Sequence, residues 1–199
     1  MSAQFSPRGL AAPAVESHPL TPAAASAPSP WVARFGALLP AGGTALDYAC
    51  GGGRHARWLA ARGLQVHAVD RDGDALSGLE GVPGVLARVL ELEDEAWPLQ
   101  GEVFDVVVVT NYLHRPRFAA LLDLVRPGGL LIYETFMAGN ERFGKPSNPA
   151  FLLRPGELLE RIGTGWTVIA FEQGEISTPR SAVVQRICAV KAETIPRLP

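Results

Sequence analysis

The stretch that decides the fold is Ala45-Leu46-Asp47-Tyr48-Ala49-Cys50-Gly51-Gly52-Gly53-Arg54, in which three consecutive glycines follow a short apolar run. The apolar run suits a buried parallel strand. After the glycines, apolar or small residues recur at helical spacing, at Ala56, Leu59, Ala60 and Gly63. The glycines therefore join the carboxyl end of a strand to a helix, which is where open α/β sheets bind ligands. Because glycine permits positive φ and free N–H groups at a helix start attract anions, we expect a nucleotide-binding turn here.

Two classes of cofactor are bound by such turns. The nicotinamide fingerprint G-x-G-x-x-G needs its third glycine where this chain has Ala56. The run from Leu46 to Gly53 instead resembles the first motif of class I S-adenosylmethionine (SAM) dependent methyltransferases, in which an apolar residue and an acid precede alternating glycines. Ala49 stands at the first of those glycine positions. The resemblance therefore implies SAM rather than a nicotinamide.

The rest of the chain alternates strand and helix patterns. Apolar runs predict strands at 64–70, 85–90, 104–111, 130–133, 166–172 and 182–190, and helical spacing predicts helices at 72–79, 116–125 and 155–162. The run 104–111 is almost wholly apolar and too short for a buried helix, so we expect a central parallel strand there. Gly174 and Pro179 predict a tight connection that makes the last two strands antiparallel.

Two further motifs extend the resemblance to most of the chain, namely Asn111-Tyr112-Leu113-His114-Arg115-Pro116 and Tyr133-Glu134-Thr135-Phe136. With them, the chain is similar to small bacterial methyltransferases of the tellurite-resistance type. The resemblance implies an α/β fold, a three-layer Rossmann-like seven-stranded sheet that is mostly parallel, with its last strand antiparallel and the order 3-2-1-4-5-7-6. We expect the Ala/Pro-rich residues 1–28 to form a flexible tail and residues 29–199 to form a single SAM-binding domain. Ser29 and Pro30 predict the start of a short helix that buries Trp31.

Residues at the strand ends are the candidates for holding the cofactor. Asp70, at the end of the second strand, is placed to accept hydrogen bonds from both hydroxyls of a ribose. The resemblance implies that an acid after the third strand contacts adenine, either Glu91 together with Leu92 or, in reserve, Asp94. The full predicted set is Asp47, Ala49, Cys50, Gly51, Gly53, Arg54, Asp70, Arg71, Glu91, Leu92, Asn111 and Tyr112.

The acceptor side is less closely defined by the sequence. A methyl group on a sulfonium is already activated, so catalysis needs chiefly orientation, which can supply about 7–11 kcal/mol. We expect the methyl group to face Tyr48, Asn111, Tyr112, His114, Glu134 and Phe136, of which Glu134, His114 and Tyr112 are the candidates for a catalytic role. His114 could be a base or could cap the helix predicted from Pro116, and Glu134 could pair with Arg154 or Arg115. A loop group comprising Asn140, Arg142, Lys145 and Arg154 could form an anion-binding rim or be ordinary loop polarity.

Composition limits the partners. The 199 residues carry a formal net charge of −2 and are 47% hydrophobic, without the basic excess typical of nucleic-acid binding. The chain shows no membrane-spanning run and no signal-peptide pattern, and its two cysteines, Cys50 and Cys188, lack metal-ligand spacing. We therefore expect a cytoplasmic bacterial methyltransferase that acts on a small molecule, with no metal, nucleic-acid or membrane partner. The accepting atom and the oligomeric state stay open. The alternatives are a catalytically silent SAM-binding module that regulates or scaffolds a partner, and a nicotinamide-dependent oxidoreductase.

Overall fold

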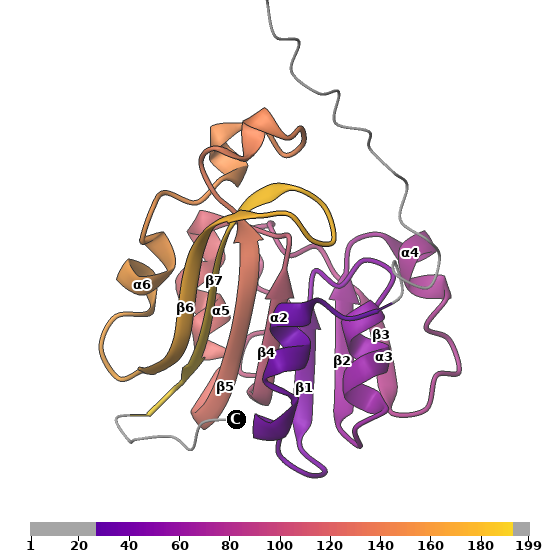
Figure 1. Ribbon diagram of the computed structural model, residues 1–199. Coiled ribbons are helices and arrows are strands. Elements are labelled where there is room, and N and C mark those ends of the chain that lie inside the picture. Colours follow the sequence, from indigo (N-terminus) through magenta and orange to yellow (C-terminus); the bar gives the residue numbers. More distant parts are fainter. Residues whose placement is uncertain (1–26, 193–199) are drawn as a thin grey trace, which may run out of the picture.

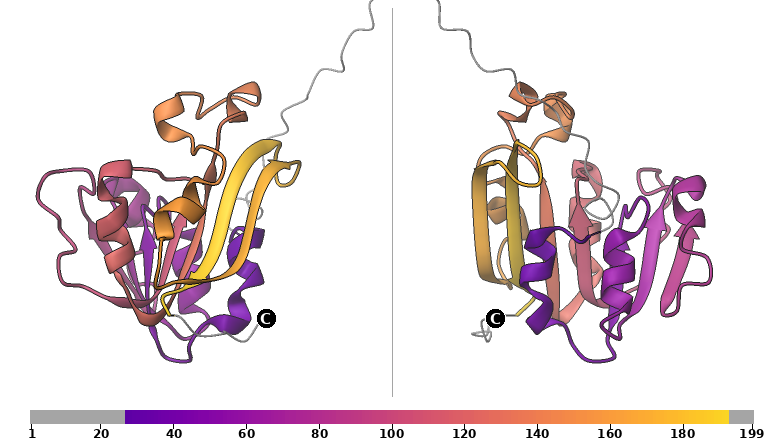
Figure 2. Two further views of the ribbon diagram at one scale, coloured as in Figure 1. Left: turned by 90° about the vertical axis from the view of Figure 1, so that its left-hand side faces the viewer. Right: turned by 45° about the vertical axis from the view of Figure 1, so that its right-hand side comes forward.

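The computed structural model describes residues 27–192, which form a seven-stranded sheet covered by helices on both faces (Figures 1 and 2). The strand order is β3-β2-β1-β4-β5-β7-β6, and β7 runs antiparallel to both of its neighbours. The strands are β1 (Thr44–Tyr48), β2 (Gln65–Asp70), β3 (Val85–Val89), β4 (Phe104–Thr110), β5 (Val125–Phe136), β6 (Thr167–Ile176) and β7 (Ala182–Val190). This order and the antiparallel last strand confirm the predicted fold. The predicted flexible tail lies outside the described residues, apart from its last two.

Short helices connect the strands. The α-helices are α2 (Pro30–Arg34), α3 (Arg54–Ala60), α4 (Gly73–Ser77), α5 (Phe118–Asp123) and α6 (Glu157–Ile162). Single 3₁₀ turns are η1 (Gly36–Leu38), η2 (Arg115–Arg117), η3 (Asn140–Arg142) and η4 (Pro149–Phe151). The predicted N-cap is confirmed, because the Ser29 hydroxyl accepts a hydrogen bond from the Trp31 backbone N–H and Trp31 is buried.

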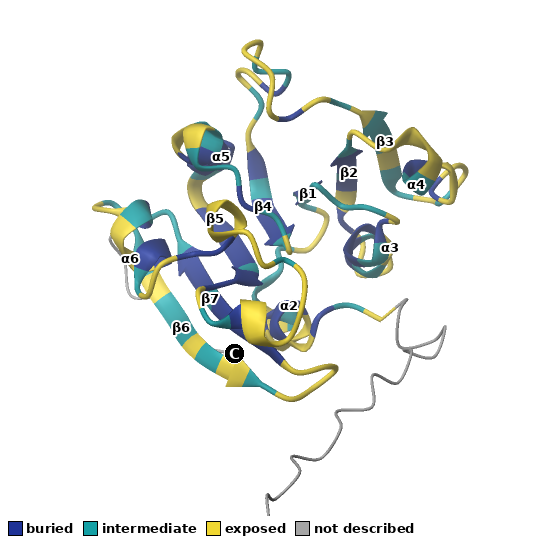
Figure 3. Ribbon diagram, turned by 90° about the horizontal axis from the view of Figure 1, so that it is seen from above, coloured by how far each residue is buried: buried dark blue, intermediate teal, exposed yellow. Residues whose placement is uncertain are grey.

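Strand β4 shows why the sheet has three layers. Its valines are fully buried, and successive side chains point to opposite faces. Val107 and Val109 pack in one apolar cluster with residues of α5 and α6, whereas Val106 and Val108 pack in a second cluster with residues of α2, α3 and α4. Seen from above, the buried strands occupy the centre and β6 lies at an edge, where its residues are half-buried or exposed (Figure 3).

The structure differs from several of the predicted boundaries. The helix predicted at 116–125 is a 3₁₀ turn followed by α5, and β5 begins at Val125 because that residue pairs with Phe104 before a bulge. Strand β6 extends to Ile176, so Gly174 pairs with Val184 inside the strand rather than lying in the connection. The helix predicted from 155 begins at Glu157. Residues 137–153 stand above the carboxyl end of β5, next to the β6–β7 connection (Figures 1 and 2).

Candidate active site

Positions 49, 51 and 53 of the glycine turn share a positive φ but differ in their surroundings. Ala49, Gly51 and Gly53 all adopt positive φ, at 52°, 52° and 69°. A Cβ on Gly53 would lie 2.5 Å from a methyl carbon of Leu79, whereas a Cβ on Gly51 would meet nothing within 4 Å. Gly53 therefore allows the start of α3 to pack against Leu79, and Gly51 leaves open space above the turn. Ala49 takes the left-handed conformation that the glycine of the motif would take, at a cost of about 1–2 kcal/mol.

Asp70 joins the end of β2 to this turn. One carboxylate oxygen accepts a hydrogen bond from the Gly51 N–H at 2.7 Å, and the other accepts from the Asp72 N–H at 3.0 Å. These bonds hold the half-buried carboxylate at the cavity wall. Because each oxygen has two acceptor sites, Asp70 retains the capacity to accept two more hydrogen bonds.

Asp47 lies behind the turn and not in the cavity. It is 1% exposed, and its Oδ2 accepts from the Ala56 N–H at 2.8 Å, near the start of α3. Its Oδ1 has no hydrogen-bond partner among the described residues and lies 3.9 Å from His55 Nδ1. Burial raises the pKa of Asp47 to about 8, and burial lowers the pKa of His55 to about 3. Because Ser29 N–H donates to His55 Nε2 at 3.1 Å, the neutral imidazole carries its proton on Nδ1.

The strand ends surround a cavity of about 390 Å³, a size typical of small-molecule sites. Seven of the predicted cofactor residues line it: Ala49, Asp70, Arg71, Glu91, Leu92, Asn111 and Tyr112. The other predicted residues, Asp47, Cys50, Gly51, Gly53 and Arg54, belong to the turn and the start of α3 and are not in the wall. Asp94, the reserve for the adenine contact, is not in the wall either.

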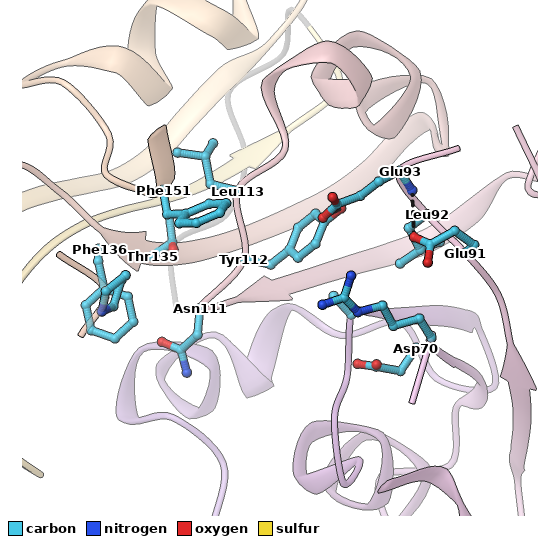
Figure 4. Close-up of a pocket in the computed structure, with 13 residues that line it drawn as sticks. Asp70, Glu91, Leu92, Glu93, Asn111, Tyr112, Leu113, Thr135, Phe136 and Phe151 are labelled. Atoms are coloured by element: carbon cyan, nitrogen blue, oxygen red, sulfur yellow. Dashed lines mark hydrogen bonds between the residues drawn. The ribbon is translucent and has the colours of Figure 1, made fainter. Parts of the chain in front are cut away.

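The two ends of the cavity differ (Figure 4). Asp70, Glu91 and Glu93 lie together at one end, and Thr135, Phe136 and Phe151 lie at the other. Glu91 Oε1 accepts from the Glu93 N–H at 3.2 Å, which shapes the acidic end. Asn111 adopts positive φ of 56° just after β4, and Figure 4 shows its side chain near Phe136, with Tyr112 between the two ends.

Tyr112 and His114 both face Glu93. The Tyr112 hydroxyl donates to Glu93 Oε1 at 3.3 Å, and His114 Nδ1 lies 3.7 Å from Glu93 Oε2. Burial raises the pKa of Tyr112, so its phenol stays protonated at neutral pH. His114 does not line the cavity, and although it precedes η2 its side chain makes no capping hydrogen bond. Tyr48, predicted to face the methyl group, is fully buried behind Tyr112 in edge-to-face contact.

Glu134 was predicted to face the methyl group, but its side chain does not line the cavity. Its carboxylate accepts from the Ser29 hydroxyl at 2.7 Å and from Arg186 at 3.1 Å. The predicted pairing with Arg154 or Arg115 is therefore wrong. Arg115 binds the fully buried Glu157 instead, at 2.8 and 2.9 Å. Side chains alternate along β5, so Glu134 shares the α2–α3 face with Leu130 and Ile132.

The four loop residues predicted as a possible anion-binding rim have different environments in the structure. Asn140 is 2% exposed and bonded to the backbone, so it cannot be a rim residue. Arg142 pairs with Glu175 and Arg154 with Glu160, both at the surface. Lys145 alone of this group faces a cavity.

Several wall residues were not predicted, namely Glu93, Leu113, Thr135, Pro146 and Phe151. Thr135 lies in the quoted motif, but alternation along the strand points it away from the face predicted for Glu134, so the sequence did not single it out. Phe151 has no signal in the sequence, because its place depends on how residues 137–153 fold back. Arg115 sets that place by donating to the carbonyl oxygens of Ala150 and Leu152, each at 2.7 Å.

Metal ions and membranes have no visible site in the described part of the chain. Residues 27–192 contain no group of three or more His, Cys, Asp or Glu side chains placed to hold a metal ion. No helix among them has the length and apolar character needed to cross a membrane.

The fold and the strand-end cavity define a class I SAM-dependent methyltransferase. Residues 23–177 match the family model described as a methyltransferase domain, and the chain belongs to this family. No curated protein sequence matches the chain.

Solved structures share the fold at low sequence identity. TehB from Haemophilus influenzae is 18% identical with a TM-score of 0.65, and the match covers 80% of this chain but only 60% of TehB. A putative SAM-dependent methyltransferase from Listeria monocytogenes is 17% identical with a TM-score of 0.62, covering 82% of this chain and 98% of that one. The 1,6-didemethyltoxoflavin-N1-methyltransferase of Burkholderia thailandensis, solved with 1,6-didemethyltoxoflavin and S-adenosylhomocysteine, is 21% identical with a TM-score of 0.61, covering 83% and 78%.

Proposed function

We propose that this methyltransferase moves the methyl group of SAM by in-line transfer to a small molecule held beside Thr135, Phe136 and Phe151. One observation carries the proposal: a single cavity has an acidic end at β2 and β3 and a largely apolar end at β5, joined at Asn111 and Tyr112. This arrangement suits two ligands that meet end to end. Family membership implies SAM as one of them.

The acidic end fits the nucleoside part of SAM. Asp70 has acceptor capacity left for two ribose hydroxyls, and Glu91 with the buried Leu92 would hold the adenine. The open space above Gly51 lets the amino-acid part approach the backbone. When bound, SAM supplies a methyl group on a positively charged sulfur, and as the acceptor's lone pair bonds to that carbon the carbon–sulfur electron pair moves to sulfur, giving S-adenosylhomocysteine.

The residues at the apolar end of the cavity would orient the methyl acceptor and would not activate it by removing a proton. Tyr112 keeps its proton, and His114 and Glu134 lie outside the cavity wall. The wall residues at this end of the cavity, Thr135, Phe136, Pro146 and Phe151, include no carboxylate or imidazole, so we expect the acceptor's proton to pass to water. Holding the two reactants in line is the main contribution expected from the protein. The Burkholderia neighbour, solved with 1,6-didemethyltoxoflavin and S-adenosylhomocysteine together, supports a small-molecule acceptor here.

Calorimetric titration with SAM and S-adenosylhomocysteine tests the proposal. We expect micromolar binding that weakens at least about tenfold in Asp70→Asn, which loses the charge that strengthens each hydroxyl contact. Asp74→Asn is the matched control, because Asp74 is exposed in α4 and does not line the cavity. Equal affinities in the two variants would contradict the assignment of Asp70. Product formation from a panel of small acceptors then separates an enzyme from a silent SAM-binding module, which would bind SAM and yield no S-adenosylhomocysteine with any acceptor.

A further inference from the structure

A second cavity of about 430 Å³ opens beside the first. The two share Asn111, Phe136, Pro146 and Phe151 as a common wall. A molecule in the second cavity therefore reaches the apolar end of the first, where the proposed function places the acceptor.

The two cavities carry opposite charge. The first is lined by Asp70, Glu91 and Glu93 against a single Arg71. The second is lined by Lys145 and Arg180, with no acidic residue in its wall.

The two cations of the second cavity are not neutralised by neighbours. Arg142 and Arg154, on the nearby surface, each pair with a glutamate, at 3.1 and 2.9 Å. Within residues 27–192, by contrast, neither Lys145 nor Arg180 forms an ion pair. Two unpaired cations on one cavity wall favour an anionic ligand.

A buried amide holds the segments that carry these cations together. Lys145 lies in the 137–153 segment, and Arg180 lies in the β6–β7 connection. Asn140 Nδ2 donates to the carbonyl oxygen of Pro146 at 3.0 Å, and Asn140 Oδ1 accepts from the Val183 N–H at 3.1 Å. Asn140 is 2% exposed, so the link between the segments is protected from water. The cations therefore stand on a shared frame and not on independent loops.

Apart from Asn111, the common wall consists of Pro146 and two aromatic side chains. Phe136 is 8% exposed and Phe151 is 53% exposed, and they lie near each other at one end of the first cavity in Figure 4. Partly exposed aromatic faces stack well on flat apolar groups. Asn148 Oδ1 accepts from the Ala150 N–H, and the neutral polar side chains of the second cavity are those of Asn111, Ser147 and Asn148. The charged groups in its wall are the two cations.

We propose that the methyl acceptor is a small organic anion, with a flat apolar body between Phe136 and Phe151 and a carboxylate directed to Lys145 and Arg180. This inference rests on the proposed function. The negative acceptor would also be attracted to the positive sulfonium, which lowers the energy of bringing the two ligands together.

Paired carboxylate and amide probes test the charge requirement. Benzoate, 4-hydroxybenzoate and indole-3-carboxylate are each titrated by calorimetry against their neutral amides, with the protein alone and saturated with S-adenosylhomocysteine. At least one carboxylate should bind about tenfold more tightly than its amide, as expected for two partly exposed charge contacts. The difference should shrink at 1 M NaCl, where the screening length is about 3 Å. No carboxylate preference in any pair, or a preference unaffected by salt, would overturn the proposal.

Charge variants locate the site. Lys145→Gln/Arg180→Gln should remove the carboxylate preference, whereas the control Arg142→Gln/Arg154→Gln removes the same charge outside both cavities and should retain it. Loss of the preference in both doubles would mean that net charge, not this cavity, attracts the anion. Inorganic phosphate is the last probe, and binding as tight as that of the aryl carboxylates would contradict a role for the aromatic walls. Carboxylate binding without S-adenosylhomocysteine binding would contradict the proposed function and leave the anion site supported.

Discussion

The hydroxyl of Ser29 donates a hydrogen bond of 2.7 Å to Glu134, 105 positions along the chain. Through this bond the segment that begins α2 is attached to the carboxyl end of β5. The same carboxylate accepts from Arg186 of β7 at 3.1 Å, and the Ser29 backbone N–H donates to His55 of α3. Ser29 and Glu134 therefore link α2, α3, β5 and β7 on one face of the sheet, outside the cavity wall.

Glu134→Gln should lower stability and spare the chemistry. Arg186 is 20% exposed and would keep Glu172 as its only charged partner within the described residues. We expect a loss of about 1–3 kcal/mol in the free energy of unfolding, since a charged group loses half of its pairing. Turnover per folded molecule should stay within about twofold of wild type. Denaturant unfolding and steady-state kinetics measure the two separately, and a kcat loss of tenfold or more at full folding would restore Glu134 as a catalytic candidate.

The contrast between Glu134 and Asp70 shows what the sequence could predict about the site. Both were expected at carboxyl strand ends, and both are there. Asp70 follows a helix and strand in fixed order after the glycine turn, so its position relative to that turn follows from topology. The sequence did not show that the Glu134 side chain would bond to Ser29 and Arg186, whereas the next two side chains, Thr135 and Phe136, both line the cavity. The sheet order, in contrast, was implied by the resemblance to class I methyltransferases, which rests in part on the glycine turn and the apolar run of β4.

Glu157 should make stability depend on acid pH. Its side chain is fully buried. Burial alone would raise its pKa, but Arg115, the Arg154 N–H and Arg161 lower that pKa from 4.5 to about 2. A carboxyl whose pKa is lower in the folded state stabilises the fold above the unfolded value, and this stabilisation is lost as pH falls from about 4.5 to about 2. The shift corresponds to about 3 kcal/mol.

Comparing Glu157→Gln with wild type across this range measures the contribution. The variant should be several kcal/mol less stable at pH 7, and its stability should fall less steeply than that of wild type between pH 4.5 and 2. Glu160→Gln is the control, because Glu160 is exposed and pairs only at the surface. Parallel pH profiles for wild type and Glu157→Gln would show that this carboxylate is not the titrating group.

Gly53→Ala should destabilise the protein more than Gly51→Ala. Both positions have positive φ, so each alanine should cost about 1–2 kcal/mol of backbone energy. Only at Gly53 does the new Cβ also meet a buried side chain, 2.5 Å from Leu79 Cδ1. Overpacking of this kind adds about 1–3 kcal/mol. Thermal or denaturant unfolding gives both values.

A double-mutant cycle with Leu79→Ala checks the cause of that difference. If the clash with Leu79 is responsible, Leu79→Ala should cost less in the Gly53→Ala background than in wild type. It should cost the same in the Gly51→Ala background. If the effects of Gly53→Ala and Leu79→Ala on the free energy of unfolding are additive, the whole loss in Gly53→Ala comes from the backbone conformation.

The cavity-wall residues in the 137–153 segment could not be predicted from the sequence. Phe151 lines both cavities because Arg115 binds the carbonyl oxygens of Ala150 and Leu152 and the carboxylate of Glu157. The sequence suggests Arg115 only as a partner for Glu134. The carbonyl oxygens of Ala150 and Leu152, which accept from Arg115, are present in every residue type and so leave no pattern in the sequence. Contacts to backbone carbonyl oxygens depend on the path of the folded chain, and the spacing of residue types in the sequence does not predict that path.

Asp47→Asn should stabilise the protein at alkaline pH. Burial raises the pKa of Asp47 from 3.8 to about 8, and the Ala56 N–H and Arg54 only partly oppose it. The unfolded chain therefore ionises this group from about pH 4, while the folded protein holds the proton until about pH 8. Wild-type stability should fall as pH rises through this range, by about 1.4 kcal/mol per pH unit for this group alone. Asparagine keeps an oxygen for the Ala56 N–H and has no charge to bury, so the variant should lose less stability between pH 5 and 8. The free energy of unfolding of wild type and variant, measured at pH 5, 6.5 and 8, tests this prediction. If the folded protein instead stabilises the ionised form of Asp47, Asp47→Asn will not gain stability relative to wild type at pH 8.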